Sequence, residues 1–321
     1  MDTLIGQNLS QASTLLTQGK LVAIPTETVY GLAANAFDEQ AVTRIFEAKN
    51  RPTFDPLIVH TYSIEQVRQF TKNIPEKAKK LAEQFWPGSL TILLEKNDLI
   101  PDLVTAGLST VAVRIPNHPL TLELLKQLDF PLAAPSANPF GYISPTTALH
   151  VEAQLKNKVS YIIDGGPCQV GIESTIVEVK NNQTTVYRLG GISVESIEAA
   201  TGKVEEVRHS SSNPKASGML KSHYAPQKKM IIGDIAALLS QYPCDKVGIL
   251  SFRKAYEQVS QQQQVVLSPE GELAKAAQGL FAGMRYLDNQ PVEIILAELM
   301  PEKGLGRAIN DRIRRAAATE S

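Results

Sequence analysis

The chain has 321 residues, of which 43% are hydrophobic and 20% charged, and its formal net charge is −1. This composition is typical of a globular protein with one large or two ordinary domains, and it excludes a disordered or fibrous chain. The near-neutral charge argues against a broad nucleic-acid-binding face. No run of roughly 18 apolar residues is present and the first residues lack the regions of a signal peptide, so we expect no membrane association and a cytoplasmic location.

The two cysteines, Cys168 and Cys244, lie far apart in the sequence and show no metal-ligand spacing. The five histidines are scattered as well. We therefore expect both thiols to be reduced and no metal site built from these side chains.

A helix is predicted over residues 3–20, and a short buried strand over 21–24. Pro25 ends this apolar run because proline cannot donate to a strand ladder. The next residues, 26–28, are Thr-Glu-Thr and place two hydroxyls and a carboxylate where the strand ends.

Asp38 is the predicted N-cap of an amphipathic helix that leads to a basic loop. Lys49 and Arg51 stand on this loop with one residue between them. Two cations beside hydroxyls suit an anion with several oxygens, of which phosphate is the commonest. A second strand, over 57–59, presents His60 at its end.

The middle of the chain alternates between helices and short strands. The pattern predicts helices over residues 64–70, 75–85, 120–128, 147–155 with Thr146 as N-cap, and 192–200. It predicts strands over residues 90–94, 109–116, 131–134, 161–163 and 176–177, and Arg188 adds one more cation after them. The lysines at 77, 79 and 80 form either a solvated helix face or a contact for phosphate or RNA.

Arg114 lies in an otherwise apolar predicted strand, on the same face as Thr110. A buried arginine without an anionic partner is very costly, so Arg114 forms either an edge-strand salt bridge or a site for a ligand carboxylate. Ser136 and Asn138 follow the next strand, in a turn that is either plain or open to a ligand. Strand ends that repeatedly carry Thr, Ser, Asn and Arg favour a single concave site.

Residues 205–228 are polar and serine-rich, as in a linker, and include one aromatic, Tyr224. From residue 229 the alternation resumes and predicts a small α/β domain with a mostly parallel sheet. Its predicted strands cover 230–232, 246–252, 265–267 and 292–296, and its helices cover 235–239, 272–287 and 306–317. We thus expect a catalytic domain over 1–204, a linker or lid over 205–228, and a small domain over 229–321.

Several sequence motifs resemble those of the YrdC-like threonylcarbamoyl-AMP synthase family. They occur in the same order and over nearly the whole chain. They are PTETVYGLAANA, KNRP, PLIVH, FWPGSLT, VAVRIPNHP, PSANPFGYISPT, DGGP, ESTIV and, in the linker, HYAP. The resemblance is to the long form of the family. It implies an α/β fold in which a YrdC-like twisted mixed sheet carries a concave basic site, followed by a smaller Rossmann-like α/β C-terminal domain.

The resemblance also implies an activity, that of an L-threonylcarbamoyladenylate synthase, which is a nucleotidyltransferase. Such an enzyme converts ATP, L-threonine and bicarbonate or CO2 to threonylcarbamoyl-AMP and pyrophosphate, for formation of threonylcarbamoyladenosine (t6A) in tRNA. The implied cofactor is Mg²⁺ with ATP. The implied partner is a downstream tRNA threonylcarbamoyl-transfer enzyme, met transiently, with tRNA itself contacted weakly at most.

The site residues are carried over from the family's motifs. Those implied for catalysis are Lys49, Arg51, Ser136 and Asn138. Those implied for ATP are Arg51, Asp55, Thr110, Ser136, Ser144, Arg188 and, as a lid, Tyr224. Those implied for threonine are Thr28, His60, Arg114, Ala134 and Ser174. A carboxylate at Asp55 would repel phosphate unless Mg²⁺ bridges the two.

Two other functions stay open at this point. The first is an RNA-binding module that recognises duplex or tRNA shape, which salt-dependent RNA binding without ATP conversion would reveal. The second is a carbamoyl-transfer domain like those of hydrogenase maturation, although the cysteine-rich and acylphosphatase-like parts expected there are missing from the sequence.

Overall fold

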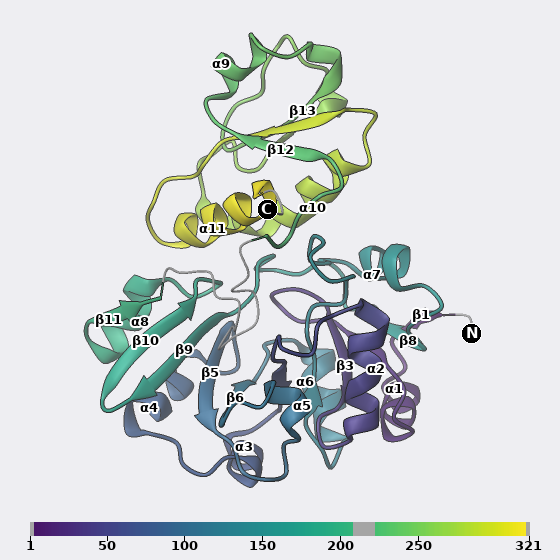
Figure 1. Cartoon of the computed structure of the whole chain (residues 1–321), viewed down its shortest axis with the longest axis vertical. Coiled ribbons are helices and arrows are strands. Elements are labelled where there is room, and N and C mark those ends of the chain that lie inside the picture. The colour runs from purple at the N-terminus through teal and green to yellow at the C-terminus, as the bar shows by residue number, and fades with distance from the viewer. Residues whose placement is uncertain (1–2, 208–221, 319–321) are drawn as a thin grey trace. The chain divides into compact units, whose positions relative to one another are not determined.

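The computed structural model describes residues 3–207 and 222–318, and the chain folds into two compact units (Figure 1). The first comprises Met1–Phe140, Pro145–Gln169 and Glu173–Leu220. The second comprises Gly141–Ser144, Val170–Ile172 and Lys221–Ser321. Two short segments from the middle of the chain therefore belong to the same unit as the C-terminal third.

The first unit is built on a mixed sheet whose described strands follow the order β1-β8-β2-β3-β7-β4-β6-β5-β9-β10-β11. These strands are β1 (Leu4–Gly6), β2 (Val22–Ile24), β3 (Gly31–Asn35), β4 (Ile58–His60), β5 (Leu90–Glu95), β6 (Thr110–Arg114), β7 (Leu132–Ala133), β8 (Tyr161–Ile163), β9 (Thr175–Lys180), β10 (Gln183–Arg188) and β11 (Val204–Glu206). β4 runs parallel to β6 and antiparallel to β7, while β5 runs antiparallel to β6 and parallel to β9. The expected mixed α/β sheet is confirmed.

Helices cover the two faces of this sheet unequally. They are α1 (Leu9–Thr17), α2 (Glu39–Lys49), α3 (Ile64–Phe70), α4 (Glu76–Phe85), α5 (Asp102–Thr105), α6 (Pro119–Lys126), α7 (Ala148–Leu155) and α8 (Val194–Thr201). α2, α4, α7 and α8 bury their apolar faces in one large core against the strands. α1 and α6 form a second core on strands β2, β3, β7 and β8.

A third apolar cluster lies on strands β4, β5, β6 and β9 and contains no helical residue. It consists of Ile58, Leu93, Ala112 and Ile176, with Tyr187 packed against it. The alternate residues of β6, Val111 and Val113, belong to the large helix-covered core. Since successive strand residues point to opposite faces, this cluster marks the face of the sheet that the helices of the large core leave uncovered.

The second unit holds a smaller sheet in which all described strands are parallel, in the order β12-β15-β13-β14. Its strands are β12 (Lys229–Ile232), β13 (Val247–Ser251), β14 (Gln264–Val266) and β15 (Ile294–Ala297). Its helices are α9 (Ile235–Leu239), α10 (Leu273–Asp288) and α11 (Leu305–Ala317), with short 3-10 turns at Cys244–Lys246 and Gln261–Gln263. The expected small parallel α/β domain is confirmed.

Gly171 makes a close approach inside this unit. Its φ is +75°, and an added Cβ would lie 2.5 Å from the Cα of Gln278 in α10. Both facts favour glycine, because a side chain would be strained by the backbone and would collide with a helix. The segment Val170–Ile172 is thus fitted closely to α10.

Some predicted elements differ from the observed ones. The helix expected over 3–20 is wrong at its start, where β1 pairs with β8 and Asn8 caps α1. β3, β10 and β11 were not expected at all. The predicted cap of α2 is confirmed, since Asp38 accepts hydrogen bonds from the N–H groups of Gln40 and Ala41. For α7 the cap is Thr147, one residue later than expected.

Candidate active site

Polar side chains form a row across the face of the sheet opposite the large helix-covered core, and they are buried there. His60 on β4 is paired in register with Arg114 on β6. The pairing of β5 with β6 places Thr91 beside Arg114, and Thr91 is paired with Ile176 on β9. Ile176 in turn is paired with Arg188 on β10. Since paired residues of neighbouring strands point to the same face, these side chains line one surface.

Arg114 is held by three neighbours and is 3% exposed. Its Nη2 lies 2.6 Å from Oε1 of Glu27. Its Nη1 donates to Oγ1 of Thr28 at 2.8 Å, and its Nε donates to the Gly88 carbonyl at 3.1 Å. The expected choice between a salt bridge and a ligand carboxylate is thus settled in part, because a salt bridge exists. It is internal rather than at an edge, since β6 lies between β4 and β5.

Glu27 was not among the expected site residues. Besides Arg114 it accepts hydrogen bonds from Ser89 Oγ at 3.1 Å and from the Asn117 N–H at 2.9 Å. Burial alone would raise the pKa of Glu27, but the charge and hydrogen bond of Arg114, with backbone donors, hold it below its usual value. Glu27 is therefore the fixed anion that neutralises Arg114.

His60 is buried beside Arg114. Its Nδ1 lies 3.3 Å from the Ile58 carbonyl, which can only accept, so Nδ1 carries a proton. Burial, and then the charge of Arg114, lower the pKa of His60 to about 3. The imidazole is therefore neutral at physiological pH. We call Glu27, Thr28, His60 and Arg114 the Arg114 end of the site.

Lys49 was expected on a loop, but it is the last residue of α2 and is 1% exposed. Its Nζ donates to the carbonyls of Ser136 and Asn138, both at 2.5 Å. The left-handed Asn50, with φ at 52°, ends the helix after it. Burial, and then the charge of Arg51, lower the pKa of Lys49 well below its usual value. Lys49 thus holds the turn that carries two other predicted site residues.

Arg51 and Asp55 form a buried ion pair, with 2.9 Å between Nη2 and Oδ2. Arg51 also donates to the carbonyls of Asp55 and Pro56, and its guanidinium lies 5.9 Å from the ring centroid of Phe140. Within the described residues, neither carboxylate oxygen of Asp55 accepts a hydrogen bond. Burial raises the pKa of Asp55, while the charges of Arg51, Lys49 and Arg188 oppose that rise.

Lys49, Arg51, Arg188 and Asp55 are called the Lys49 end below. With every group ionised it carries three positive charges and one negative, a net charge of +2. If Lys49 gives its proton to Asp55, the two arginines still leave a net charge of +2. Such an excess in a buried place favours an anion with more than one charge.

Ser174 contacts both Thr91 and Arg188. Its Oγ lies 2.7 Å from Oγ1 of Thr91, and Arg188 donates to this Oγ at 3.1 Å and to the Ser174 carbonyl at 3.0 Å. Residues expected to serve different substrates, Ser174 for threonine and Arg188 for ATP, therefore contact each other directly. Thr91, which sequence reasoning missed, completes this chain of hydroxyls.

The remaining predicted residues of the first unit are Ala134, Asn138 and Thr110. Ala134 is buried after β7 and donates its N–H to the Ile58 carbonyl at 2.9 Å. Asn138 is buried in the turn that Lys49 holds, where its Nδ2 donates to the Pro139 carbonyl at 2.9 Å. Thr110 begins β6, roughly 13 Å along the strand from Arg114. It thus lies at the opposite end of β6 from the Arg114 end.

Ser144 and Tyr224 belong to the second unit. The Ser144 side chain is buried, and its carbonyl accepts a hydrogen bond from Nε of Arg285 at 3.3 Å. Tyr224 stacks on Phe281 with 5.4 Å between ring centroids, and the Arg312 guanidinium lies 5.5 Å from its ring. Its role as a lid stays a prediction. Of the expected linker, residues 208–221 lie outside the described part of the chain.

Metal ligands do not gather anywhere in the described residues as a group of three His, Cys, Asp or Glu side chains. Mg²⁺ that arrives with a nucleotide needs less, because one carboxylate and phosphate oxygens suffice. Asp55 fits that requirement, since its carboxylate is at the Lys49 end and accepts no described hydrogen bond.

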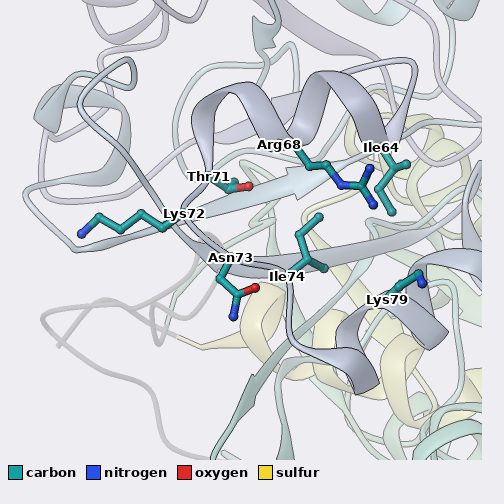
Figure 2. A pocket seen from close by; sticks show the side chains of 7 residues that line it. All are labelled: Ile64, Arg68, Thr71, Lys72, Asn73, Ile74 and Lys79. Carbon is teal, nitrogen blue, oxygen red and sulfur yellow. The ribbon is translucent and has the colours of Figure 1, made fainter.

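A second group of cations lines a hollow of about 330 Å³ beside α3 and α4 (Figure 2). Arg68 is exposed there, Lys79 lies 3.8 Å from Glu83, and Lys72 pairs with Glu95 at 3.1 Å. Lys77 instead donates to a backbone carbonyl, that of residue 182, at 2.7 Å. These exposed pairs are typical of a solvated helix face.

Cys168 and Cys244 are both free thiols, as expected. Cys168 is buried, and burial, followed by the charge of Glu27, raises its pKa to about 12. It is therefore a protonated packing residue. In the described part of the chain, no helix is long and apolar enough to cross a bilayer.

The fold and the site define a class: a two-unit α/β protein whose uncovered sheet face carries a neutral, arginine-based end and a strongly cationic end. Residues 14–190 match the Sua5/YciO/YrdC family model, described as "Telomere recombination". Residues 192–318 match the model described as the C-terminal domain of threonylcarbamoyl-AMP synthase. The chain belongs to the threonylcarbamoyl-AMP synthase family, in the form that has both domains.

Relatives and a solved structure are similar over nearly the full length. The threonylcarbamoyl-AMP synthase of Pyrococcus abyssi is 41% identical, over 95% of this chain and 93% of the relative. That of Bacillus subtilis is 40% identical, over 96% of this chain and 92% of the relative. The crystal structure of P. abyssi Sua5 complexed with L-threonine matches with a TM-score of 0.92 and 38% identity, covering 99% of this chain and 98% of that one.

Proposed function

We propose that this enzyme forms threonylcarbamoyl-AMP and pyrophosphate from ATP, L-threonine and bicarbonate or CO2. The observation that carries the proposal is the similarity, at about 40% identity over nearly the whole chain, to proteins named for this product. The division of the site into two ends supports it, because the two main substrates differ in charge as the two ends do.

The Arg114 end suits threonine. An amino acid is a zwitterion, and an end where Glu27 balances Arg114 accepts it without creating net charge. Nη1 and Nη2 of Arg114 each carry two N–H groups. Nη1 uses one of them on Thr28, and Nη2 lies 2.6 Å from Glu27 but makes no well-aligned hydrogen bond within the described residues, so donors on both nitrogens remain for a ligand carboxylate. Thr28, His60, Ala134 and Ser174 would surround the rest of the amino acid. His60, being neutral, adds no charge that would repel the ammonium group.

The Lys49 end suits the triphosphate. Its net charge of +2 attracts a polyanion, and Arg51 and Arg188 provide planar guanidinium groups for phosphate oxygens. Ser136, Asn138 and Thr110 would complete the contacts to the nucleotide in this unit. A bound phosphate beside Lys49 would favour its charged form and so reverse the pKa depression that burial causes.

The reaction needs two bond-forming steps. The ammonium group of threonine loses a proton, and uptake of one proton converts bicarbonate to CO2 and water. The neutral amine then attacks the carbon of CO2 and releases a second proton to solvent, which gives a carbamate. A carbamate oxygen then attacks the α-phosphorus of ATP, and the bond to the bridging oxygen breaks as pyrophosphate leaves. Neither step requires an enzyme nucleophile, so the protein acts by positioning and charge stabilisation.

This second step makes the enzyme a nucleotidyltransferase that uses Mg²⁺ with ATP. When bound, Mg²⁺ neutralises phosphate charge and polarises phosphoryl oxygens. Asp55, with Ser136 and Asn138, would hold it. The product is a reactive mixed anhydride, so we propose transient delivery to a tRNA threonylcarbamoyl-transfer enzyme in the cytoplasm for t6A formation, with weak tRNA contact at most.

The proposal is tested by measuring pyrophosphate release from ATP and Mg²⁺ with bicarbonate, adding each of the twenty amino acids singly. Release that requires L-threonine, together with an adenylate product of the expected mass, would support the assignment. Absence of release with every amino acid, combined with salt-sensitive RNA binding, would replace the enzyme by an RNA-binding module.

A further inference from the structure

Residues Gly141–Ser144 form a short excursion of the chain out of the first unit. The residue before it, Phe140, donates its N–H to the Lys49 carbonyl at 2.8 Å. The residue after it, Pro145, accepts a hydrogen bond from the Tyr30 N–H at 2.9 Å. Both flanks are thus attached to the first unit, while the excursion itself packs in the second. Ser144 is also one of the residues expected at ATP.

Arg285 of α10 holds the backbone of this excursion. Its Nε donates to the Ser144 carbonyl at 3.3 Å, and its Nη2 donates to the Ile143 carbonyl. Its guanidinium lies 5.1 Å from the ring centroid of Tyr142. The arginine is buried, and burial lowers its pKa to about 10, so it stays charged at physiological pH. A single side chain therefore contacts three consecutive residues of the excursion.

Asp288, three residues further along α10, holds the same excursion through its Oδ2, which accepts a hydrogen bond from the Tyr142 hydroxyl at 2.6 Å. Its Oδ1 accepts one from the Lys228 N–H at 3.0 Å, and its carbonyl accepts one from the Lys228 ammonium group. Burial, and then Asp288, raise the pKa of the Tyr142 phenol, so the hydroxyl remains a donor.

The contacts of Arg285 and Asp288 with the excursion are directed hydrogen bonds, which a surface that only packs would not need. Arg285 donates two hydrogen bonds to backbone carbonyls, those of residues 143 and 144. Such bonds do not depend on which side chains stand at these two positions. Asp288 fixes the ring on which the guanidinium lies. Together these contacts hold the backbone of residues 143 and 144 in place, and we call them the clamp. Ser144 is followed directly in the chain by Pro145, which belongs to the first unit.

We propose that Arg285 is a positioning residue for ATP: together with Tyr142 and Asp288 it fixes the backbone of residues 143 and 144, and it thereby raises the affinity of the enzyme for nucleotide. The inference rests on the proposed function, because it takes Ser144 as part of the ATP site. Arg285 of α10 would act indirectly, by holding the backbone that carries Ser144.

The test uses the full-length protein and compares Arg285→Gln, Arg285→Lys and Tyr142→Phe with Arg253→Gln as the matched control. Arg253 is an exposed arginine of the same unit with no described partner. We expect Arg285→Gln to raise the KM for ATP roughly tenfold or more and to leave the KM for threonine within about twofold, because a charged donor to a backbone carbonyl is lost. Arg285→Lys should restore part of the effect, and Arg253→Gln should change neither constant.

Tyr142→Phe decides the question if Arg285→Gln fails to fold, as its melting curve would reveal. This variant keeps the ring beside the Arg285 guanidinium and removes only the hydroxyl that donates a hydrogen bond to Asp288. We expect a rise of about threefold in the KM for ATP alone. Equal changes in both KM values, or none in a folded variant, would overturn the inference.

Binding of a non-hydrolysable ATP analogue, measured by calorimetry, separates this inference from the proposed function. If the unaltered protein binds the analogue but releases no pyrophosphate with threonine, the proposed function fails. Weaker binding by Tyr142→Phe would then still support the clamp. If the analogue binds equally to the unaltered protein and to a folded Arg285→Gln variant, the clamp fails although the proposed function stands.

Discussion

The two ends of the site solve the same physical problem in opposite ways. Both bury cations, but Arg114 has a fixed anion, Glu27, whereas the Lys49 end has more positive than negative charge. The pKa values record the difference: that of Glu27 is lowered, and that of Asp55 is raised despite its cationic neighbours. At the Arg114 end the carboxylate of Glu27 neutralises the guanidinium group. Among the four groups of the Lys49 end the cations outnumber the one carboxylate, and this favours binding of an anion.

The largest effect is expected at the Lys49 end. Lys49→Met should lower the rate of pyrophosphate release roughly 100- to 1,000-fold, as loss of a buried charge donor does in other active sites. It should also lower the free energy of unfolding by about 1–3 kcal/mol, because the carbonyls of Ser136 and Asn138 both lose a charged donor. Rates and thermal melts measure both.

The matched control is Lys80→Met, which removes an exposed lysine with no described partner. It should change neither the rate nor the melting temperature. A Lys49→Met variant that kept its rate within tenfold would contradict the role of the Lys49 end as a phosphate site.

The charge balance of the Arg114 end is broken by Glu27→Gln. Arg114 would then be buried without an anion, and breaking a buried pair in this way costs about 3–5 kcal/mol of stability. We expect the KM for threonine to rise roughly tenfold or more, since Arg114 loses its fixed position, and the KM for ATP to change little. Chemical unfolding and steady-state kinetics provide the measurements.

Glu95→Gln serves as the comparison for this change, because Glu95 pairs with Lys72 on the surface, where both side chains are more than half exposed. Its effect on unfolding should stay within about 1 kcal/mol. Equal effects of the two substitutions on stability would show that Glu27 is not a partner of special importance to Arg114.

Asp55→Asn sharpens the charge argument at the Lys49 end. If Asp55 holds Mg²⁺, the concentration of Mg²⁺ that gives half-maximal rate should rise by about three- to tenfold, because an amide is a weaker ligand than a carboxylate. The free energy of unfolding should also fall, by up to about 3–5 kcal/mol, because Asp55 is the carboxylate paired with the buried Arg51. An unchanged Mg²⁺ requirement would remove Asp55 from the metal site.

The last prediction concerns His60 and pH. Its folded-state pKa of about 3 lies below the usual value of about 6.5, so between these values the unfolded chain binds the extra proton. The free energy of unfolding must therefore fall as the pH is lowered through this window, by at most about 1.4 kcal/mol per unit from this group. Urea unfolding from pH 7 to pH 4 should give a flatter dependence for His60→Gln, and an identical slope would contradict burial of a neutral imidazole.

Local signals in the sequence predicted most of the helices and strands. They could not predict which residues distant in the sequence would contact one another. Asp38 was identifiable as a cap because its signal lies within three residues of the helix that it starts. β3 was missed because its small residues, buried on a central strand, show no alternation. Lys49 was assigned to a loop because the helix ends one residue later, at a left-handed asparagine that no periodicity reveals.

The kinds of residues in the site were predictable from the sequence, but the contacts between them were not. Cations and hydroxyls at strand ends indicated where ligands would bind. The contact of Glu27 with Arg114, and that of Thr91 with Ser174, depend on the order of strands β4, β6, β5 and β9, which only the assembled sheet defines. The resemblance supplied residue roles, but it said nothing of Glu27, which binds a neighbour rather than a substrate.

The interleaved chain has a consequence for exchanging domains between relatives. A C-terminal domain taken from another family member would have to fit two segments of the host chain, Gly141–Ser144 and Val170–Ile172, which come from the middle of the chain but belong to the same unit. Gly171 tolerates no side chain against Gln278, and Arg285 needs the carbonyls of residues 143 and 144. A functional chimera must therefore carry both short segments along with its C-terminal domain, because the three segments pack against one another in a single unit.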